Sequence, residues 1–283
     1  MLHAVFPGGA RVRPRLLLAA TRAAGGPEDP LAYAAAAAVE LLHCASLAHD
    51  DLPCFDDADV RRGLPTVHQA FGEAMAVLVG DGLIVLAFDV LAHALEARPA
   101  VGLRPLTLLA SAAGAKGGLV AGQAWELEDE VDLAAYHRAK TASLFEASAA
   151  IGAALAGVEA APFARLGRTL GMTYQLADDV CDRVGDTEDL GKRPGRDAAL
   201  RRPTAASDLD VARSRLRLSM RQALLAVPPC PGEPQLRATV EGVLDRLAGR
   251  CRLDRHDAAE STGSAPGRAS ANSRRTGSTF SVG

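Results

Sequence analysis

The chain has 283 residues, of which 48% are hydrophobic and only 4% aromatic, and its formal net charge is −3. This length supports one sizeable core or at most two domains, and the small net charge excludes a global field that would attract nucleic acid or an anionic membrane. The five cysteines form no CxxC pair or zinc-binding spacing, which is typical of a reducing compartment. No secretory leader and no uncharged apolar run of about 18 residues occurs. We therefore predict a soluble, cytoplasmic protein with no nucleic-acid partner and no stable membrane insertion.

Apolar residues recur with helical spacing along nearly the whole chain, and runs rich in Val, Ile and Thr that would indicate strands are absent. In chain order, the pattern predicts helices over 14–24, 30–51, 68–97, 103–127, 132–157, 160–183, 208–226 and 233–250. The many alanines favour helices that pack closely. From about Cys251 the composition becomes polar, Ser/Gly-rich and aperiodic. We expect an all-α domain over residues 1–250 and a disordered C-terminal tail over 251–283.

A dense acidic stretch, LAHDDLPCFDDADVRRGLPTVH over residues 47–68, follows the alanine-rich helix of 30–51. Pro53 disfavours helical geometry just before it, so Asp50 and Asp51 are predicted at the C-terminal end of this helix, where the helix dipole disfavours negative charge. A solvated acidic loop is one explanation of the cluster. A hard cation explains the placement better, because Mg²⁺ binds one or two carboxylates together with phosphate oxygens and water.

A second acidic cluster ends the predicted helix of 160–183, within the segment YQLADDVCDRVGDTEDLGK. Asp178 and Asp182 are four residues apart, so their carboxylates share one helix face, and Asp179 lies beside them. A like-charge pair at this spacing destabilises a helix by about 0.2–0.5 kcal/mol, so helix stability does not account for it. Two aspartate-rich helix ends would together hold several Mg²⁺ ions, and those ions would hold a diphosphate.

Cations accompany both acidic clusters. Arg61 and Arg62 follow the first, Lys192 follows the second, and Arg11 and Arg13 lie near the start of the chain. Each alone could be an ordinary surface residue, but the planar fork of arginine binds phosphate oxygens in pairs and lysine acts as a point charge. The phosphate-binding loops of nucleotide folds, GxxxxGKS or GxGxxG after a strand, do not occur. The acidic and basic groups together indicate a small diphosphate as the ligand.

These motifs resemble those of the trans-isoprenyl diphosphate synthases, and the resemblance extends over almost all of residues 4–250. The first aspartate motif of that family in its bacterial form (DDxxxxD), the second (DDxxD) and the KT segment are matched at Asp50, Asp51 and Asp56, at Asp178, Asp179 and Asp182, and at Lys140 and Thr141. His43 stands where the family has a histidine that contacts isopentenyl diphosphate. The segment HCASLAHDDLPCFDDAD is most similar to the geranylgeranyl diphosphate synthases of bacterial carotenoid and photosynthetic pigment pathways.

The resemblance implies the all-α isoprenoid synthase fold, with antiparallel helices around a central active-site cavity, in a homodimer with three Mg²⁺ ions per active site. It implies a head-to-tail prenyltransferase that condenses isopentenyl diphosphate with an allylic diphosphate by ionisation, condensation and proton loss. The implied metal ligands are Asp50, Asp51, Asp56, Asp178 and Asp182. The other implied roles are neutralisation of the leaving diphosphate by Arg61, Lys140 and Lys192, polar contacts near the allyl cation from Thr141 and Gln175, and binding of isopentenyl diphosphate by Arg13, His43 and Arg62.

Product length is predicted from the residues one turn before Asp50, which are Ala45 and Ser46 and should face the growing chain. Bacterial farnesyl diphosphate synthases typically have an aromatic residue at the position of Ala45, which closes the pocket. The small side chain here favours a C20 product over C15, although it could also serve only tight helix packing. The deeper floor is expected near Leu41 or on the helix that contains Met75.

Some features depart from the family pattern. Ala10 stands where the family has a lysine that contacts isopentenyl diphosphate, and Arg11 is a candidate substitute. The glycine pair at residues 8–9 comes early, so the first helix is expected to be truncated. These departures leave open a weakly active regulatory subunit, and the possibility that the small Ala45 serves only helix packing leaves open a C15 synthase. A terpene cyclase of the same fold is disfavoured, because it usually carries an Asn/Asp–Ser/Thr–Glu metal triad in place of the second DDxxD.

Overall fold

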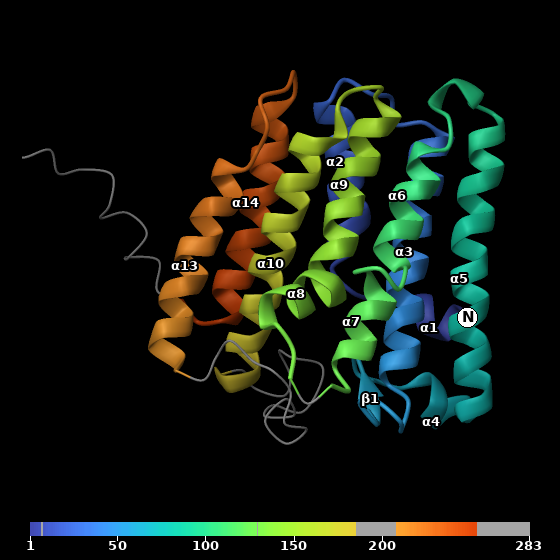
Figure 1. Ribbon diagram of the computed structural model, residues 1–283, viewed down its shortest axis with the longest axis vertical. Helices are drawn as coiled ribbons and strands as arrows, with labels where there is room; N and C mark the ends of the chain where they lie inside the picture. Colours follow the sequence, from blue (N-terminus) through green and yellow to red (C-terminus); the bar gives the residue numbers. More distant parts are fainter. Residues whose placement is uncertain (7, 129, 185–207, 254–283) are drawn as a thin grey trace, which may run out of the picture. The chain divides into compact units, whose positions relative to one another are not determined.

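The computed structural model describes residues 1–6, 8–128, 130–184 and 208–253, and Met1–Leu253 form one compact unit. Lys192 and most of the predicted tail lie outside the described residues. Figure 1 shows long helices side by side, with α13 at one edge of the bundle and α5 at the other. The longer helices are α2 (Val12–Ala23), α3 (Pro30–Asp50), α5 (Glu73–Glu96), α6 (Arg104–Ala113), α9 (Ser143–Leu155), α10 (Ala160–Val184), α13 (Leu209–Leu225) and α14 (Glu233–Arg250). The shorter elements are α1 (Leu2–Val5), α4 (Val67–Phe71), the 3-10 turn η1 (Pro99–Val101), α7 (Leu119–Trp125), α8 (Leu133–His137) and the π-helix η2 (Arg138–Ala142).

The predicted all-α architecture is confirmed, and three of the predicted helices are divided. The helix expected over 68–97 begins as α4 and restarts as α5 after Gly72, whose φ of 86° breaks the helix. The helix expected over 103–127 consists of α6 and α7, because the glycine-rich segment 114–118 interrupts it. The helix expected over 132–157 contains the π-helix η2 between α8 and α9. Single-turn π-helices are often found at functional sites.

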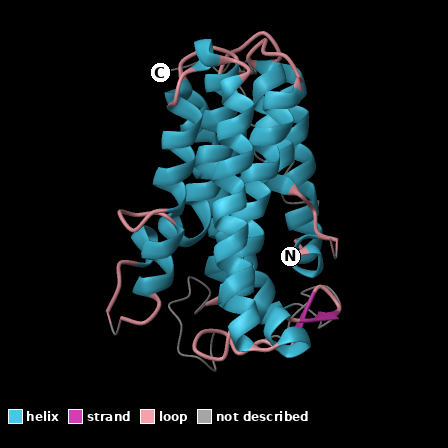
Figure 2. Cartoon of the chain, turned by 90° about the vertical axis from the view of Figure 1, so that its right-hand side faces the viewer, coloured by secondary structure: helices cyan, strands magenta, loops and turns pink. Residues whose placement is uncertain are grey.

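A short antiparallel hairpin was missed by the sequence pattern. Strand β1 (Val60–Arg61) pairs with β2 (Leu64–Pro65). The two-residue turn between them, Arg62 and Gly63, has φ values of 54° and 78°, as the tight hairpin turn that matches strand twist requires. Strands of two residues are too short to show an alternating pattern of apolar and polar residues, so the sequence did not predict them. Figure 2 shows the hairpin, in magenta, at one end of the helical bundle.

The bundle has two large apolar cores, one among α2, α9, α10, α13 and α14 and the other among α2, α3, α5, α6 and α9. Small residues allow the helices to approach one another closely, as the alanine content predicts. At Gly152 of α9, a Cβ atom would lie 2.5 Å from the backbone oxygen of Leu17 on α2. A larger residue there would force the two helices apart.

Arg11 fixes the N-terminal segment rather than lining the active-site cavity. It precedes α2 with a φ of 48°, and its guanidinium donates to the carboxylate of Glu40 on α3 and to the carbonyl of Val5 on α1. Glu40 is buried, so the ion pair satisfies a charge that would otherwise be costly. The idea that Arg11 replaces the missing lysine at Ala10 therefore receives no support from its position.

Helices α3 and α5 are long and apolar enough to cross a membrane by length and composition alone. In α3, 61% of the apolar window is buried inside the bundle, as in the core helix of a soluble protein. In α5 only 33% is buried. The outward face of α5 carries Met75, Leu78 and Val85, which are exposed. One face of α5 therefore packs on α3, and the other is exposed at these three residues, although the side chain of Met1 lies against Gly82 on the same face.

Candidate active site

The helices enclose a cavity of about 840 Å³ with a polar end and an apolar end. The ends of α3 and α10, the π-helix η2 and the loop after α3 surround the polar end, whereas α3, α5, α6 and α7 surround the apolar end. Of the residues implied by the resemblance, those that line it are Arg13, His43, Ala45, Ser46, Asp50, Asp56, Arg61, Arg62, Lys140, Thr141, Gln175, Asp178 and Asp179. Segments more than 100 residues apart in the chain therefore converge on one site, as the two acidic motifs predicted.

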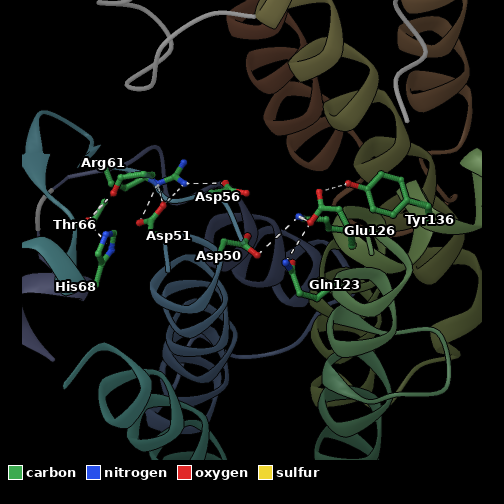
Figure 3. A network of polar contacts seen from close by, with 11 residues as sticks. Asp50, Asp51, Asp56, Arg61, Thr66, His68, Gln123, Glu126 and Tyr136 are labelled. Atoms are coloured by element: carbon green, nitrogen blue, oxygen red, sulfur yellow. Dashed lines mark hydrogen bonds and ion pairs between the residues drawn. The ribbon is translucent and has the colours of Figure 1, made fainter. Parts of the chain in front are cut away.

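In the first acidic cluster, Asp50 and Asp51 point in different directions. Helix α3 ends at Asp50, which lines the cavity together with Asp56 from the following loop. Asp51 caps the helix, is buried, and accepts a hydrogen bond of 3.0 Å from Nε of Arg61. The same guanidinium lies 3.7 Å from Asp56 (Figure 3). Asp51 therefore holds Arg61 at the rim of the cavity, and the expectation that Asp51 is itself a metal ligand stays an untested prediction that this orientation does not favour.

The carboxyl group of Asp50 is held in an unfavourable electrostatic environment. Burial, together with the neighbouring carboxylates of Asp56 and Glu126, raises its pKa to about 6, although Lys140 and Arg61 act in the opposite direction. Asp50 also lies at the negative end of the dipole of α3. A divalent cation at this end of the cavity would relieve the excess of negative charge.

In the second acidic cluster, too, only some of the carboxylates line the cavity. Asp178 and Asp179 line the cavity, whereas Asp182 is buried in α10 and is not among the lining residues of the described part of the chain. Gln175 donates a hydrogen bond of 2.8 Å to Oδ1 of Asp179, and the Thr141 hydroxyl donates to the side-chain oxygen of Gln175. These two hydrogen bonds, from Thr141 to Gln175 and from Gln175 to Asp179, link η2 to α10. The prediction that Asp182 binds metal remains untested.

Lys140 reaches the cavity from the π-helix η2, opposite the end of α3. Its Nζ lies 3.8 Å from Oδ1 of Asp50 and 2.5 Å from Oε2 of Glu126. Helix α7 can approach this segment because Gly122 has no side chain: a Cβ there would lie 2.5 Å from the backbone nitrogen of Lys140. Gly122 thus sets the distance between the carboxylate on α7 and the lysine on η2.

Substituting Gly122 with alanine is expected to move α7 away from Lys140. Overpacking of this kind costs about 1–3 kcal/mol, so the melting temperature should fall and kcat/KM should decrease, since Lys140 loses its position. Steady-state kinetics and thermal unfolding check both effects. Gly242→Ala in α14 is the matched control, because the nearest atom to its new Cβ is the flexible end of Arg246 at 4.0 Å. A Gly122→Ala variant as active and stable as this control would contradict the packing argument.

A second group of cations lies on the other side of the polar end. The guanidinium of Arg13 lies 4.5 Å from the ring centroid of Phe145, and its buried Nε has no hydrogen-bond partner among the described residues. Burial lowers the pKa of Arg13, and burial with the nearby arginines lowers the pKa of His43 well below its ordinary value. Arg62 lines the same region and donates to the carbonyl of Gly8. A crowded, partly desolvated group of cations favours an anion in this part of the cavity.

The apolar end of the cavity begins at Ala45 and Ser46, both of which line it. Beyond them the walls are formed by apolar side chains of α3, α5 and α7, namely Leu42, Ile84, Phe88, Leu119 and Val120. The floor was expected near Leu41 or on the helix of Met75. Leu42, which is adjacent to Leu41, and Ile84 and Phe88 of α5, the helix that contains Met75, all line the cavity, and the position of its floor stays a prediction.

Several residues that line the cavity were not predicted, among them three polar ones near its acidic end. Glu126 lines the polar end beside Lys140, Tyr174 lines it next to Gln175, and Arg250 at the end of α14 lies 3.1 Å from Oδ1 of Asp178. Tyr174 directly precedes Gln175 in YQLADD, so the second acidic motif was a usable signal for it, whereas Glu126 in AGQAWELE lies in none of the motifs identified from the sequence. Arg250 ends an otherwise ordinary helix about 70 residues from its partner, and no local pattern indicates it.

A helical cavity with paired carboxylates, two groups of cations and an apolar extension defines an enzyme site for small diphosphates that carry hydrocarbon chains. A family model described as polyprenyl synthetase matches residues 1–215. The geranylgeranyl diphosphate synthase of Cereibacter sphaeroides is 48% identical over 247 residues, which cover 87% of this chain and 86% of that protein. The corresponding enzyme of Rhodobacter capsulatus is 46% identical over 84% of this chain and 83% of its own length.

Solved structures agree with this assignment. A geranyltransferase from Helicobacter pylori complexed with magnesium and isoprenyl diphosphate superimposes with a TM-score of 0.78 at 30% identity, over 88% of this chain and 86% of that chain. A decaprenyl diphosphate synthase from Rhodobacter capsulatus gives a TM-score of 0.74 at 26% identity, over 88% of each chain. The chain belongs to the polyprenyl synthetase family and has the isoprenoid synthase fold.

Proposed function

We propose that this chain is a geranylgeranyl diphosphate synthase, which condenses isopentenyl diphosphate with allylic diphosphates up to C20. The relatives that it resembles along most of its length carry this name. The observation that carries the proposal is the cavity itself, whose carboxylates and cations meet at one end and whose apolar end continues past the small Ala45. A site for two charged diphosphates and one growing hydrocarbon needs this division.

The donor groups of the polar end fit Mg²⁺. Asp50, Asp56, Asp178 and Asp179 offer oxygen ligands from two sides of one cavity. Within the described residues, no three acidic, histidine or cysteine side chains converge closely enough to form a complete metal site. Mg²⁺ commonly uses one or two carboxylates and completes its shell with water and substrate phosphate oxygens. When bound, it would stabilise the charge of the departing diphosphate, and the number of ions, three in our proposal, follows the family.

The chain's own residues account for the other requirements of the allylic substrate. Lys140 and Arg61 present positive charge to the polar end, where they neutralise the leaving diphosphate, and we assign Lys192 the same role from the resemblance alone. Thr141 and Gln175 place polar oxygen atoms beside the position of the allyl cation. The apolar side chains that line the rest of the cavity would limit the access of water, which would otherwise capture that cation. The released diphosphate accepts the final proton.

Isopentenyl diphosphate is assigned to the group formed by Arg13, His43 and Arg62. The buried Nε of Arg13 gains a partner when a phosphate oxygen arrives, which offsets the cost of its desolvation. The lowered pKa of His43 keeps the imidazole neutral near pH 7, so that it donates one hydrogen bond without adding to the repulsion among the arginines.

Product analysis tests the proposal. Purified protein, Mg²⁺ and labelled isopentenyl diphosphate are incubated with C5, C10 and C15 allylic primers, and the alcohols are identified after phosphatase treatment. A C20 product is expected from each primer. A C15 end point would keep the reaction and contradict the chain-length assignment. No elongation by a folded, metal-supplied protein would favour a regulatory subunit, which would then be active only with a partner synthase.

We further propose that the protein is a cytoplasmic homodimer that pairs through α5. The exposed fractions of Leu78 and Val85 on its outward face are 62% and 68%, and exposed apolar faces of this kind usually mark an interface. Replacing Val85 with aspartate is expected to give a monomer, because the charge would be desolvated at the centre of the interface. Light scattering after size-exclusion chromatography checks this. Leu225→Asp, on the exposed face of α13, is the control and should remain dimeric.

A further inference from the structure

Glu126 lies at the centre of a set of polar contacts beside the acidic end of the cavity (Figure 3). Its Oε1 accepts a hydrogen bond of 2.7 Å from the Tyr136 hydroxyl, and its Oε2 accepts one of 3.2 Å from the side-chain amide of Gln123. The same Oε2 lies 2.5 Å from Nζ of Lys140. These contacts come from α7, α8 and η2, so one carboxylate joins three elements at the cavity wall.

The position of Glu126 is unfavourable for a carboxylate that serves only packing. It caps the C-terminal end of α7, where the helix dipole disfavours negative charge, and its side chain is only 5% exposed. An ionised group in such a place requires a cation and hydrogen-bond donors. Lys140 supplies the cation, while Tyr136 and Gln123 fix the orientation of the carboxylate.

Lys140 has two acidic neighbours at different distances. Its Nζ lies 2.5 Å from Glu126 and 3.8 Å from Asp50 on the opposite side of the polar end. Because a lysine side chain is flexible and its charge compact, the ammonium would move to Asp50 if Glu126 lost its charge. The Lys140–Asp50 ion pair, which is 3.8 Å long here, would then shorten to a hydrogen bond and occupy a carboxylate that the proposed function needs for Mg²⁺.

We propose that Glu126 is a positioning residue that holds the Lys140 ammonium away from Asp50 and so keeps Asp50 accessible to Mg²⁺. The inference rests on the proposed function of the cavity. Glu126 itself acts through Lys140, and its contacts with Tyr136 and Gln123 keep it rigid. Loss of the Glu126 charge should therefore weaken metal binding even though Glu126 supplies no ligand.

The test measures Mg²⁺ binding directly, by calorimetric titration of the full-length protein in the presence of inorganic diphosphate. The variants are Glu126→Gln, Lys140→Met and the double substitution, with Glu128→Gln as the control because Glu128 is exposed near the same end of α7. Glu126→Gln is expected to raise the Kd of Mg²⁺ about tenfold, a common size of coupling between contacting residues. In the Lys140→Met background the same substitution should have no further effect on the Kd.

The outcomes are distinguishable. A wild-type protein that binds no Mg²⁺ with diphosphate would overturn the proposed function and the inference with it. Wild-type binding with an unchanged Kd in Glu126→Gln would overturn the inference alone, as would an equal effect of Glu126→Gln with and without Lys140. Should Glu126→Gln fail to fold, Glu126→Asp and Tyr136→Phe replace it. Glu126→Asp keeps the negative charge but moves it farther from Lys140, and Tyr136→Phe removes a hydrogen bond that orients Glu126. Each should therefore raise the Kd of Mg²⁺ by a smaller factor than Glu126→Gln. An unchanged Kd in both variants would contradict the proposal.

Discussion

Asp50→Asn is expected to lower kcat/KM by about 10³-fold. Asp50 lines the polar end from the last turn of α3 and faces Lys140 across the cavity. A Mg²⁺ ion held here in part by Asp50, as proposed, would contribute several kcal/mol of charge stabilisation in the transition state, and each 1.4 kcal/mol corresponds to about a factor of ten. Steady-state kinetics with the C15 primer measures the loss. Asp57→Asn is the control, because Asp57 is exposed in the same loop and its φ of 47° suits asparagine.

The same substitution is expected to stabilise the metal-free fold above pH 6. The pKa of Asp50 in the folded protein is about 6, against an ordinary value of 3.8, so between these values the folded state binds more protons than the unfolded state. Wild-type stability therefore decreases as pH rises through this window, by about 2–3 kcal/mol for one such group. Asparagine does not titrate. The difference in melting temperature between Asp50→Asn and wild type in a chelator should thus be small near pH 4, grow up to pH 6 and then level off. If this difference in melting temperature did not change with pH, the pKa of Asp50 would not be raised in the folded protein.

How far the sequence predicts this site depends on whether a feature is local. Both acidic motifs, the arginine pair and the KT segment are continuous in the chain, and their convergence followed from two helices that end in carboxylates. The direction in which each carboxylate points could not be predicted from the sequence. Adjacent residues in the last turn of a helix point about 100° apart. Here Asp50 faces the cavity, whereas Asp51 is turned toward Arg61 on a hairpin that the sequence pattern did not predict.

Features set by tertiary packing were missed for related reasons. The π-helix η2 brings the adjacent residues Lys140 and Thr141 to one cavity wall, and the close approach at Gly122 depends on it. Arg250 reaches Asp178 only because α14 packs back along the bundle. Glu126 had no partner visible in the sequence, since Lys140 follows 14 residues later, beyond the segment that separates α7 from α8. Pairs of this kind become predictable only when the arrangement of the helices is known.

Ala45→Phe is expected to change the main product from C20 to C15 while the earlier condensations continue. Ala45 is buried at the point where the polar end gives way to the apolar walls of Ile84 and Phe88. A phenylalanine ring there would fill the space that the last isoprene unit needs, without touching the carboxylates one turn further along α3. Chromatography of the dephosphorylated products with the C5 and C10 primers measures the distribution.

Two further variants separate this steric effect from general damage to the fold. Ala37→Phe places the same ring on the exposed side of α3 and should leave the product at C20. Phe88→Ala removes bulk from the far wall and is expected to extend part of the product beyond C20, because the cavity then continues toward α5. If Ala45→Phe folds, retains turnover and still makes C20, the growing prenyl chain of the product passes along another wall of the cavity, and Ala45 serves only helix packing. If Ala45→Phe stops at C15 while Phe88→Ala leaves C20 unchanged, the length is set at α3 alone, and the apolar end beyond Phe88 is never reached by the product.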